Sequence, residues 1–187
     1  MIINNHICAL KNFQKQIMIK LLQKIYDVSV YTLKCCMHEH YEDCPWREQA
    51  LYAMDSRNQA LCGYYAFKSY EFQKASLILI ANGLRKDGLL SICSPSEVDI
   101  VIPFFSLVYP IQVYEYIKYT GDESILKQVG KTIAKVMDNF TSKMDENGLI
   151  PALPYPNWNF YEWSKGSENG DQIARKKEDF YPYQHDL

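Results

Sequence analysis

The sequence contains few residues that break helices and has no excess of charge of either sign. Glycine and proline occur eight times each among 187 residues, and the formal net charge is −2. A disordered chain needs low hydrophobicity and high net charge, so a composition of 48% apolar and 22% charged residues excludes one. The charge balance also gives no reason to expect a nucleic acid or a membrane surface as partner. With 14% aromatic residues, the chain is expected to form long helices joined by aromatic-rich loops.

Long hydrophobic runs are also absent. No apolar segment approaches the roughly 20 residues that a membrane-spanning helix requires. The N-terminus lacks the compact order of charged and then apolar residues that marks a signal peptide. The six cysteines are spread among apolar residues instead of forming a short disulfide scaffold. We therefore expect a cytoplasmic protein with free, buried thiols and no membrane partner.

One cluster combines thiols and imidazoles within ten residues: Cys35, Cys36, His38, His40 and Cys44. Its spacing matches no closed zinc pattern, and adjacent cysteines point to different sides of a helix. We expect structural thiols, no metal and no cofactor, with a zinc site as the alternative.

The periodicity of apolar residues predicts an all-α fold. The first helix ends near Met37 and has one buried stripe of residues three or four positions apart, namely Ile17, Leu21, Ile25, Val28, Thr32 and Cys36. The second helix has a break near Asp55. The second, third and fourth helices are expected over 45–69, 72–84 and 103–120, and a fifth follows Asp122.

Capping residues set the expected ends of these helices. The second helix begins at Pro45 behind Asp43 as its cap. The third ends at about Gly83, where glycine supplies a left-handed C-terminal position. Gly121 stops the fourth helix, and Asp122 caps the fifth. The buried stripe of the fifth helix is Ile125, Val129, Ile133, Val136 and Phe140.

A short turn motif occurs twice, sixty residues apart. An Asp-Gly-Leu sequence around Gly88 and an Asn-Gly-Leu sequence around Gly148 each close a pair of expected helices. Helix pairs with such a period are typical of stacked αα-hairpins, in an open solenoid or a closed toroid. Two unrelated turns are the alternative, because Asp-Gly and Asn-Gly turns are common.

Polar residues are dense between residues 38 and 49. This stretch holds four carboxylates, two histidines and one arginine in twelve residues. Asp43 and Arg47 are four positions apart and Glu48 follows, so a ligand near this helix start would meet several polar groups and a proton donor. The alternative is a capped helix start with a surface salt bridge.

Aromatic residues are dense between residues 153 and 163, where two Trp, two Tyr, one Phe and one Glu occur in eleven residues. Aromatic rings stack on the C–H faces of sugars while nearby Asn and Glu bind the hydroxyl groups, so this stretch favours a carbohydrate site. The alternative is that the rings close the end of the helix stack. Phe104, Phe105 and Ser106, preceded by Asp99, are expected to line the same mouth, since loops after successive hairpins gather on one face.

The chain from about Leu21 to Lys165 resembles the catalytic domain of bacterial α-L-rhamnosidases, glycoside hydrolase family 78. The most specific element is the Asp-Cys-Pro-Trp-Arg sequence of residues 43–47. Weaker support comes from the first Asp-Gly-Leu motif, from Thr-Gly-Asp at 120–122 and from residues 158–163. The resemblance implies an (α/α)6 toroid and the inverting hydrolysis of terminal α-L-rhamnosides by a general acid and a general base.

The resemblance assigns substrate-binding roles position by position. Asp43 and Arg47 match family residues that bind the sugar in the −1 subsite. Trp158 and Trp163 match the aromatic residues of the later loop, and Glu162 is a candidate hydrogen-bonding partner of the sugar. A carbohydrate is therefore the expected ligand.

The general acid is less directly matched. Many family members have a glutamate where this chain has Gln49, and an amide cannot donate a proton as an acid does. Either Glu48 takes the role, or the acid lies elsewhere, or the site does not turn over; we take Glu48 as the candidate catalytic residue. The Gly-Trp pair found downstream in many members reads Tyr52-Ala53 here, which removes one expected aromatic wall.

The length limits this interpretation. At about sixty residues per hairpin, six hairpins need roughly 360 residues, and this chain shows about two and a half. We expect an N-terminal extension at 1–16, a partial six-hairpin domain at 17–164 and a polar, poorly ordered tail at 165–187. The family's general base belongs to the second half of the toroid, so we expect a truncated enzyme with low or no activity alone.

Two other hypotheses belong to different classes. One is a helical module that binds carbohydrate without catalysis. The other is a self-associating protein, because an open half-toroid exposes an apolar flank that a closed ring would bury.

Overall fold

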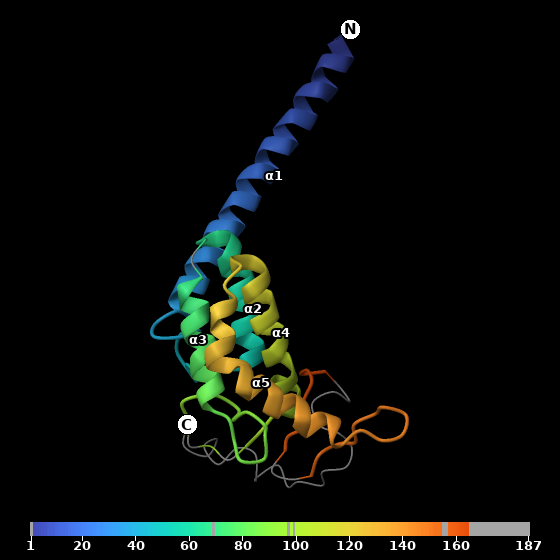
Figure 1. Cartoon of the computed structure of the whole chain (residues 1–187). Helices are drawn as coiled ribbons and strands as arrows, with labels where there is room; N and C mark the ends of the chain where they lie inside the picture. The colour runs from blue at the N-terminus through green and yellow to red at the C-terminus, as the bar shows by residue number, and fades with distance from the viewer. Residues whose placement is uncertain (1, 69, 97, 99, 155–156, 165–187) are drawn as a thin grey trace.

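The computed structural model describes residues 2–68, 70–96, 98, 100–154 and 157–164 (Figure 1). This part of the chain is helical, and strand-type pairing within it is limited to isolated bridges. The all-α fold predicted from apolar periodicity is therefore confirmed. The helices are α1 (Ile2–Cys35), α2 (Ala53–Ala66), α3 (Glu71–Asn82), α4 (Pro103–Thr120), the short 3-10 helix η1 (Glu123–Ile125) and α5 (Leu126–Thr141).

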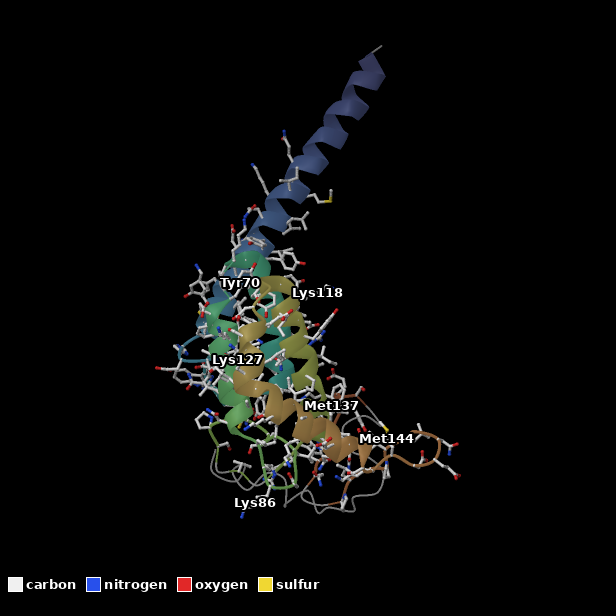
Figure 2. All side chains as sticks on the ribbon, in the orientation of Figure 1. Tyr70, Lys86, Lys118, Lys127, Met137 and Met144 are labelled. Carbon is white, nitrogen blue, oxygen red and sulfur yellow. The ribbon has the colours of Figure 1, made fainter. Side chains whose placement is uncertain are left out.

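Helices α2 to α5 form two stacked αα-hairpins. Within the hairpins α2 contacts α3 and α4 contacts α5, while α2 contacts α4 and α3 contacts α5 between them. The loops after α3 and α5 lie at the same end of the bundle, where α2 and α4 begin (Figure 1). Lys86 marks this end, and Tyr70 and Lys118 mark the opposite end (Figure 2). The predicted hairpin stack is confirmed, and its loops gather on one face as expected.

The two predicted turns share the same backbone hydrogen bonds. In the first turn, the Arg85 N–H donates to the Leu89 carbonyl at 2.8 Å, and the Gly88 N–H donates to the Arg85 carbonyl at 3.1 Å. The equivalent bonds at 145–149 measure 2.8 and 3.0 Å. Gly88 and Gly148 both have left-handed backbones, with φ of 84° and 78°. The two turns, sixty residues apart in the sequence, therefore have the same backbone structure.

The core lies between the two hairpins. On α5 and η1, the predicted stripe is buried at Ile125, Val129, Val136 and Phe140, and Ile133 packs against the core. Tyr109 on α4 is fully buried, and its hydroxyl donates to the Leu77 carbonyl of α3 at 2.9 Å. Apolar burial, the main favourable contribution to folding, thus joins the two hairpins into one unit.

A buried glutamine fixes the start of α2 against α4. The Gln112 amide donates to the Ala53 carbonyl at 2.6 Å. Its oxygen accepts from the Ser56 hydroxyl at 3.2 Å and from the Gln73 amide at 3.1 Å. Because buried polar groups are costly when unpaired, this network holds the beginning of α2 in one register.

The prediction for the first helix is right in type and wrong in extent and burial. Helix α1 begins at Ile2, fifteen residues before the expected start. Its predicted stripe is exposed at Ile17, Leu21, Ile25 and Val28, and much of α1 projects beyond the hairpins (Figures 1 and 2). The reason is that only the last turn and the residues that follow it contact the core among the described residues. The periodicity showed which face of α1 is apolar, but not whether another element covers that face.

The prediction that the second helix starts at Pro45 is also wrong. Helix α2 begins at Ala53 and continues without a break through Asp55. Asp43 is not its cap, because the Asp43 carboxylate accepts from the Ala50 N–H at 2.9 Å and the Asp43 N–H donates to the Ala50 carbonyl at 3.1 Å. These bonds close a loop that keeps the intervening residues out of the helix.

The predicted ends of the other helices are confirmed at Gly121 and Asp122, but Gly83 differs in its backbone conformation. Gly121 is left-handed, with φ of 72°, and the Asp122 carboxylate accepts from the Ser124 N–H, so the predicted stop and cap are confirmed. Gly83 follows α3 as predicted, but its φ of −79° is not left-handed. Close packing is the reason for a glycine there, since an added Cβ would lie 3.1 Å from the Cβ of Ser94.

Some predictions concern residues outside the described ranges. The polar tail at 165–187 and Asp99 are among them. Within the described chain, no helix combines the length and the apolar character needed to cross a membrane.

Candidate functional site

The loop between α1 and α2 carries Asp43, Arg47 and Glu48, the first predicted site residues. Asp43 is partly buried and closes the loop, whereas Arg47 and Glu48 are exposed. The Glu48 N–H donates to the Cys44 thiol at 3.4 Å, and Arg47 makes no ion pair or hydrogen bond with another described residue. The alternative of a capped helix start with a surface salt bridge fits this stretch only in part, because no helix starts at Asp43 and the pairing within it is between His38 and Glu42, at 2.8 Å.

Four carboxylates share one environment at the start of α2. Burial raises the pKa of Asp55, and the negative charges of Asp43, Glu48 and Glu162 raise it further. Salt screens charges over about 8 Å at physiological ionic strength, so these three carboxylates belong to the electrostatic surroundings of Asp55. Glu48 of the preceding loop and Glu162 of the aromatic stretch thus both act on Asp55.

Sequence analysis did not single out Asp55. Its place in the first turn of α2 is one where carboxylates are common, because they interact favourably with the positive end of the helix dipole. Only the fold shows that the charges of three other carboxylates raise its pKa.

A connected set of aromatic rings lies beside these carboxylates. The Tyr52 ring contacts Phe105 with 6.2 Å between centroids, and Phe105 contacts Phe160 at 6.4 Å. Phe160 lies 4.9 Å from both Trp158 and Trp163, and the two indoles are 5.8 Å apart. Phe105 therefore lies between the aromatic stretch and Tyr52, which follows the polar stretch and supplies a ring to the site.

Backbone pairing holds the aromatic stretch in place. The Trp158 N–H donates to the Val101 carbonyl at 2.6 Å. Phe160 is buried, as expected if the rings close the helix stack, but Tyr161 and Trp163 are 57% and 67% exposed. These two rings therefore present the kind of face on which a sugar stacks.

Comparison with known proteins identifies the fold of this site. The model of the bacterial alpha-L-rhamnosidase 6 hairpin glycosidase domain matches residues 18–180. The chain belongs to this family. The resemblance found in the sequence is thus confirmed, while no curated protein matches the chain.

Two solved structures are similar to this chain. A family 78 rhamnosidase of Bacillus sp. GL1 matches with a TM-score of 0.70 and 26% identity, covering 77% of this chain and 15% of its own. A rhamnosidase from Klebsiella oxytoca with rhamnose bound matches with a TM-score of 0.64 and 26% identity, covering 69% of this chain and 26% of its own. This chain thus spans about a quarter or less of either protein.

Some polar residues of the six-hairpin domain serve its framework instead of a ligand. The Asn159 side chain is buried and exchanges two hydrogen bonds with the Leu153 backbone, at 3.0 and 2.9 Å. Ser106 is fully buried and accepts from the Leu90 N–H at 3.0 Å, so it does not line the mouth as expected.

The thiol and imidazole cluster of the domain forms local contacts. His38 Nδ1 lies 2.8 Å from the Glu42 carboxylate, and His40 Nδ1 lies 2.9 Å from the Tyr41 carbonyl oxygen. Among the described residues, no three His, Cys, Asp or Glu side chains are placed to hold a metal ion. The five described thiols are free, but Cys36 alone is buried, so the expectation of buried thiols is wrong for most of them.

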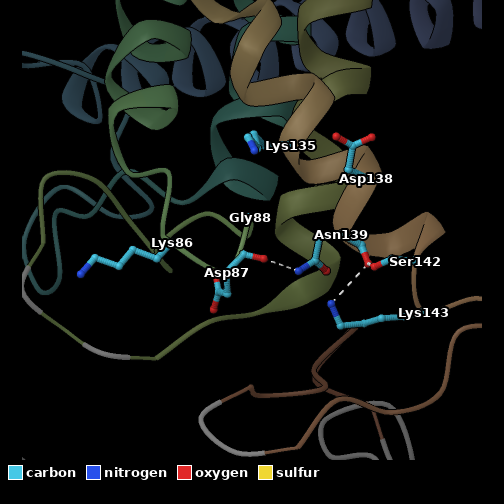
Figure 3. A pocket seen from close by; sticks show the side chains of 8 residues that line it. All are labelled: Lys86, Asp87, Gly88, Lys135, Asp138, Asn139, Ser142 and Lys143. Atoms are coloured by element: carbon cyan, nitrogen blue, oxygen red, sulfur yellow. Dashed lines mark hydrogen bonds between the residues drawn. The ribbon is translucent and has the colours of Figure 1, made fainter.

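A hollow of about 370 Å³ lies between the first repeated turn and α5 of the domain (Figure 3). The Asn139 side chain donates to the Asp87 carbonyl there, and the Lys143 ammonium donates to the Asn139 carbonyl at 3.3 Å. None of the predicted site residues lines it; its walls are Lys86, Asp87, Gly88, Lys135, Asp138, Asn139, Ser142 and Lys143.

Proposed function

We propose that this chain supplies the sugar-binding part of an inverting α-L-rhamnosidase site that acts on terminal α-L-rhamnosides. The observation that carries the proposal is the link from Glu48 through Tyr52 and Phe105 to the aromatic stretch, where the Tyr52 O–H donates to Glu48 at 2.8 Å, together with the effect of Glu48 and Glu162 on the pKa of Asp55. Carboxylates next to exposed rings suit the hydroxyl groups and the apolar face of a sugar. The rhamnose bound to the similar Klebsiella oxytoca protein supports rhamnose as the sugar.

Each site residue has a distinct proposed role in binding. The Asp43 carboxylate uses Oδ1 for the Ala50 N–H, so Oδ2 accepts from a sugar hydroxyl. Arg47 is exposed and donates to the sugar oxygens. Trp158 and Trp163 form the stacking wall, and Glu162 accepts from a further hydroxyl.

Glu48 is the proposed general acid. It transfers its proton to the glycosidic oxygen while the bond from that oxygen to the anomeric carbon breaks. A second carboxylate takes a proton from a water molecule, whose oxygen attacks the anomeric carbon from the opposite face. In inverting enzymes the two carboxyl groups stand roughly 6.5–9.5 Å apart to hold that water. We assign no general base among the described residues, and we therefore expect little turnover by this chain alone.

Titration with L-rhamnose, followed by tryptophan fluorescence, tests binding. We expect a saturable change in the wild-type chain that is lost in Asp43→Asn, which keeps an oxygen for the Ala50 N–H. The matched control is Asp145→Asn, a similar change in the second repeated turn. If no sugar produces a response in the wild-type chain, the proposed binding role is wrong.

Hydrolysis of an aryl α-L-rhamnoside tests catalysis. We expect negligible turnover by the wild-type chain, so that binding without turnover would fit both this proposal and the module that only binds carbohydrate. Clear turnover that is abolished by Glu48→Gln would establish the acid and contradict the proposed low activity. Turnover that survives Glu48→Gln and is lost in Asp55→Asn would move the acid role to Asp55.

Self-association is a second candidate function, favoured by the apolar surface of α1. Leu21, Leu22, Ile25 and Val28 are each more than half exposed. Exposed apolar patches of this kind promote association between proteins. Light scattering should show a multimer that dissociates in Ile25→Lys but not in Gln16→Lys, which adds the same charge to the same helix. A monodisperse wild-type monomer would contradict this candidate.

The cytoplasmic location remains part of the proposal. Five free thiols in the described chain are typical of a reducing compartment.

A further inference from the structure

Tyr52 is held from both its backbone and its ring, immediately before α2. Its backbone forms an antiparallel bridge with Cys93, and its ring packs edge-on against Phe105 at 6.2 Å. Neither neighbour lies in the loop that carries Glu48. Contacts with the hairpin framework therefore help to fix the phenol, in addition to the hydrogen bond from the Tyr52 N–H to the Ala50 carbonyl of the loop at 3.1 Å.

The hydroxyl end of Tyr52 reaches Glu48. The Tyr52 O–H donates to Glu48 Oε2 at 2.8 Å, and it is the only hydrogen bond that any described side chain makes to this carboxyl group. Glu48 is exposed, and an exposed glutamate otherwise samples several rotamers. A hydrogen bond from a fixed phenol therefore restricts a side chain that the loop alone leaves mobile.

The contact distinguishes the two oxygens of Glu48. Oε2 is occupied by the phenol, and Oε1 has no hydrogen-bond partner among the described residues. Burial raises the pKa of Tyr52, and the hydrogen bond and the charge of Glu48 raise it further. The phenol consequently stays protonated and remains a donor in neutral and acidic solution.

We propose that Tyr52 is a positioning residue for Glu48, which holds Oε2 and directs Oε1 toward the glycosidic oxygen. The inference rests on the proposed function of Glu48 as general acid. The proton moves from Oε1 to the glycosidic oxygen as the glycosidic bond breaks, and Glu48 is left as a carboxylate. Because hydrogen bonds to charged acceptors are stronger than those to neutral ones, the contact with Tyr52 strengthens as the proton leaves.

Two ligands test whether Tyr52 acts on the glycosidic oxygen. Methyl α-L-rhamnoside carries this oxygen, and 1,5-anhydro-L-rhamnitol lacks it. We expect the wild-type chain to bind the rhamnoside about 2- to 10-fold more tightly, the range of one net hydrogen bond. Tyr52→Phe should lose this preference and keep its affinity for the anhydro sugar. Glu48→Gln should lose the same preference, and the double variant should show no additional loss.

Tyr65→Phe is the matched control, because the Tyr65 hydroxyl contacts Tyr119 and not the proposed site. It should retain the wild-type preference. A preference that survives in Tyr52→Phe would overturn the inference and leave the proposed function standing. If neither ligand binds the wild-type chain, the proposed function fails and the inferred role of Tyr52 falls with it.

A spectroscopic measurement tests the contact without a sugar. The ring carbon bonded to the hydroxyl of Tyr52 is followed by NMR in ¹³C-tyrosine protein as pH rises, and it is assigned by its absence in Tyr52→Phe. In Glu48→Gln the pKa of Tyr52 should fall, since the negative charge that raises it is removed. An unchanged titration would overturn the inference even if both sugars bind.

Discussion

Asp43 and Ala50 are joined by two hydrogen bonds that close the loop in front of α2: the Ala50 N–H donates to the Asp43 carboxylate at 2.9 Å, and the Asp43 N–H donates to the Ala50 carbonyl at 3.1 Å. The carboxylate of Asp43 thus supports the loop with one oxygen and is available to a sugar with the other. Substitutions at this position affect two properties that can be separated by the choice of residue.

Asp43→Ala should open the loop, whereas Asp43→Asn should keep it closed. Loss of the acceptor leaves the Ala50 N–H without its partner and should cost about 1 kcal/mol of unfolding free energy. Arg47 lies at the exposed tip, so tryptic cleavage after Arg47 should be several-fold faster in Asp43→Ala. Urea unfolding and limited proteolysis measure both effects. Equal cleavage rates in the two variants would show that the loop does not depend on this acceptor.

Gly88→Ala should destabilise the chain more than Gly148→Ala, although the two turns are equivalent. Both residues have a left-handed backbone, so each substitution should cost about 1 kcal/mol. At Gly88 the new Cβ would also lie 2.9 Å from the Lys135 carbonyl oxygen, while nothing lies within 4 Å at Gly148. This crowding should add on the order of 1 kcal/mol. The comparison is made by urea unfolding, and equal losses would contradict it.

Gln112→Leu should be strongly destabilising. It removes three hydrogen bonds and leaves the Gln73 amide N–H without its acceptor in the core, while the Ala53 carbonyl keeps the Ser56 hydroxyl as donor. A loss of about 2–4 kcal/mol of unfolding free energy is expected, since a buried unpaired group costs about 1–3 kcal/mol and each lost hydrogen bond adds about 1 kcal/mol or less. Gln128→Leu on the exposed side of α5 is the control and should change the free energy little. Similar stabilities of the two variants in urea would refute the structural role of the network.

Asp122 should make stability depend on pH in acid. Its carboxylate accepts from the Lys74 ammonium at 2.7 Å, from Ser124 and from the Tyr116 hydroxyl at 2.9 Å, and these bonds hold its pKa well below the usual range. Because the pKa is lower in the folded chain, the stabilisation is complete above the unfolded value of about 4 and is lost as pH falls below it.

The melting temperature of wild type and Asp122→Asn, measured from pH 7 to pH 3, tests this dependence. The wild-type chain should melt higher at neutral pH, and the gap should close as the solution becomes more acidic. Asp138→Asn, which changes an exposed carboxylate on α5, should show no such convergence. A gap that stays constant down to pH 3 would rule out the linkage.

Local signals predicted the second hairpin well. Helix α4 runs from Pro103 to Thr120 as expected, because the proline, the left-handed Gly121 and the Asp122 cap each act on the few residues around them. The predicted stripe of α5 is also buried. The stripe of α1 was predicted equally clearly and is exposed. Periodicity specifies which face of a helix is apolar, but whether anything covers that face depends on other elements.

The site shows the same division between local and distant information. The sequence placed Glu48 and Trp163 in the two dense stretches, and the shared face of the hairpin loops predicted that Phe105 lies beside the aromatic stretch, as its contact with Phe160 shows. It did not identify Asp55, because the charges that raise its pKa belong to residues outside α2, namely Asp43, Glu48 and Glu162. It also misread Asp43, whose partner Ala50 lies seven residues away and gives the same local pattern as a helix cap.

The bridge between Val101 and Asn157 sets the order in which this site is assembled. Glu48 and Trp158 are about 110 residues apart in the sequence, so the loop that joins them must close before the two halves of the site meet. During synthesis the loop that carries Glu48 leaves the ribosome before residues 153–163. The aromatic stretch therefore docks only after both hairpins have been synthesised. Assembly of the ligand site is thus a late event in folding, because the Val101–Asn157 bridge forms only once residues 142–163 have been synthesised.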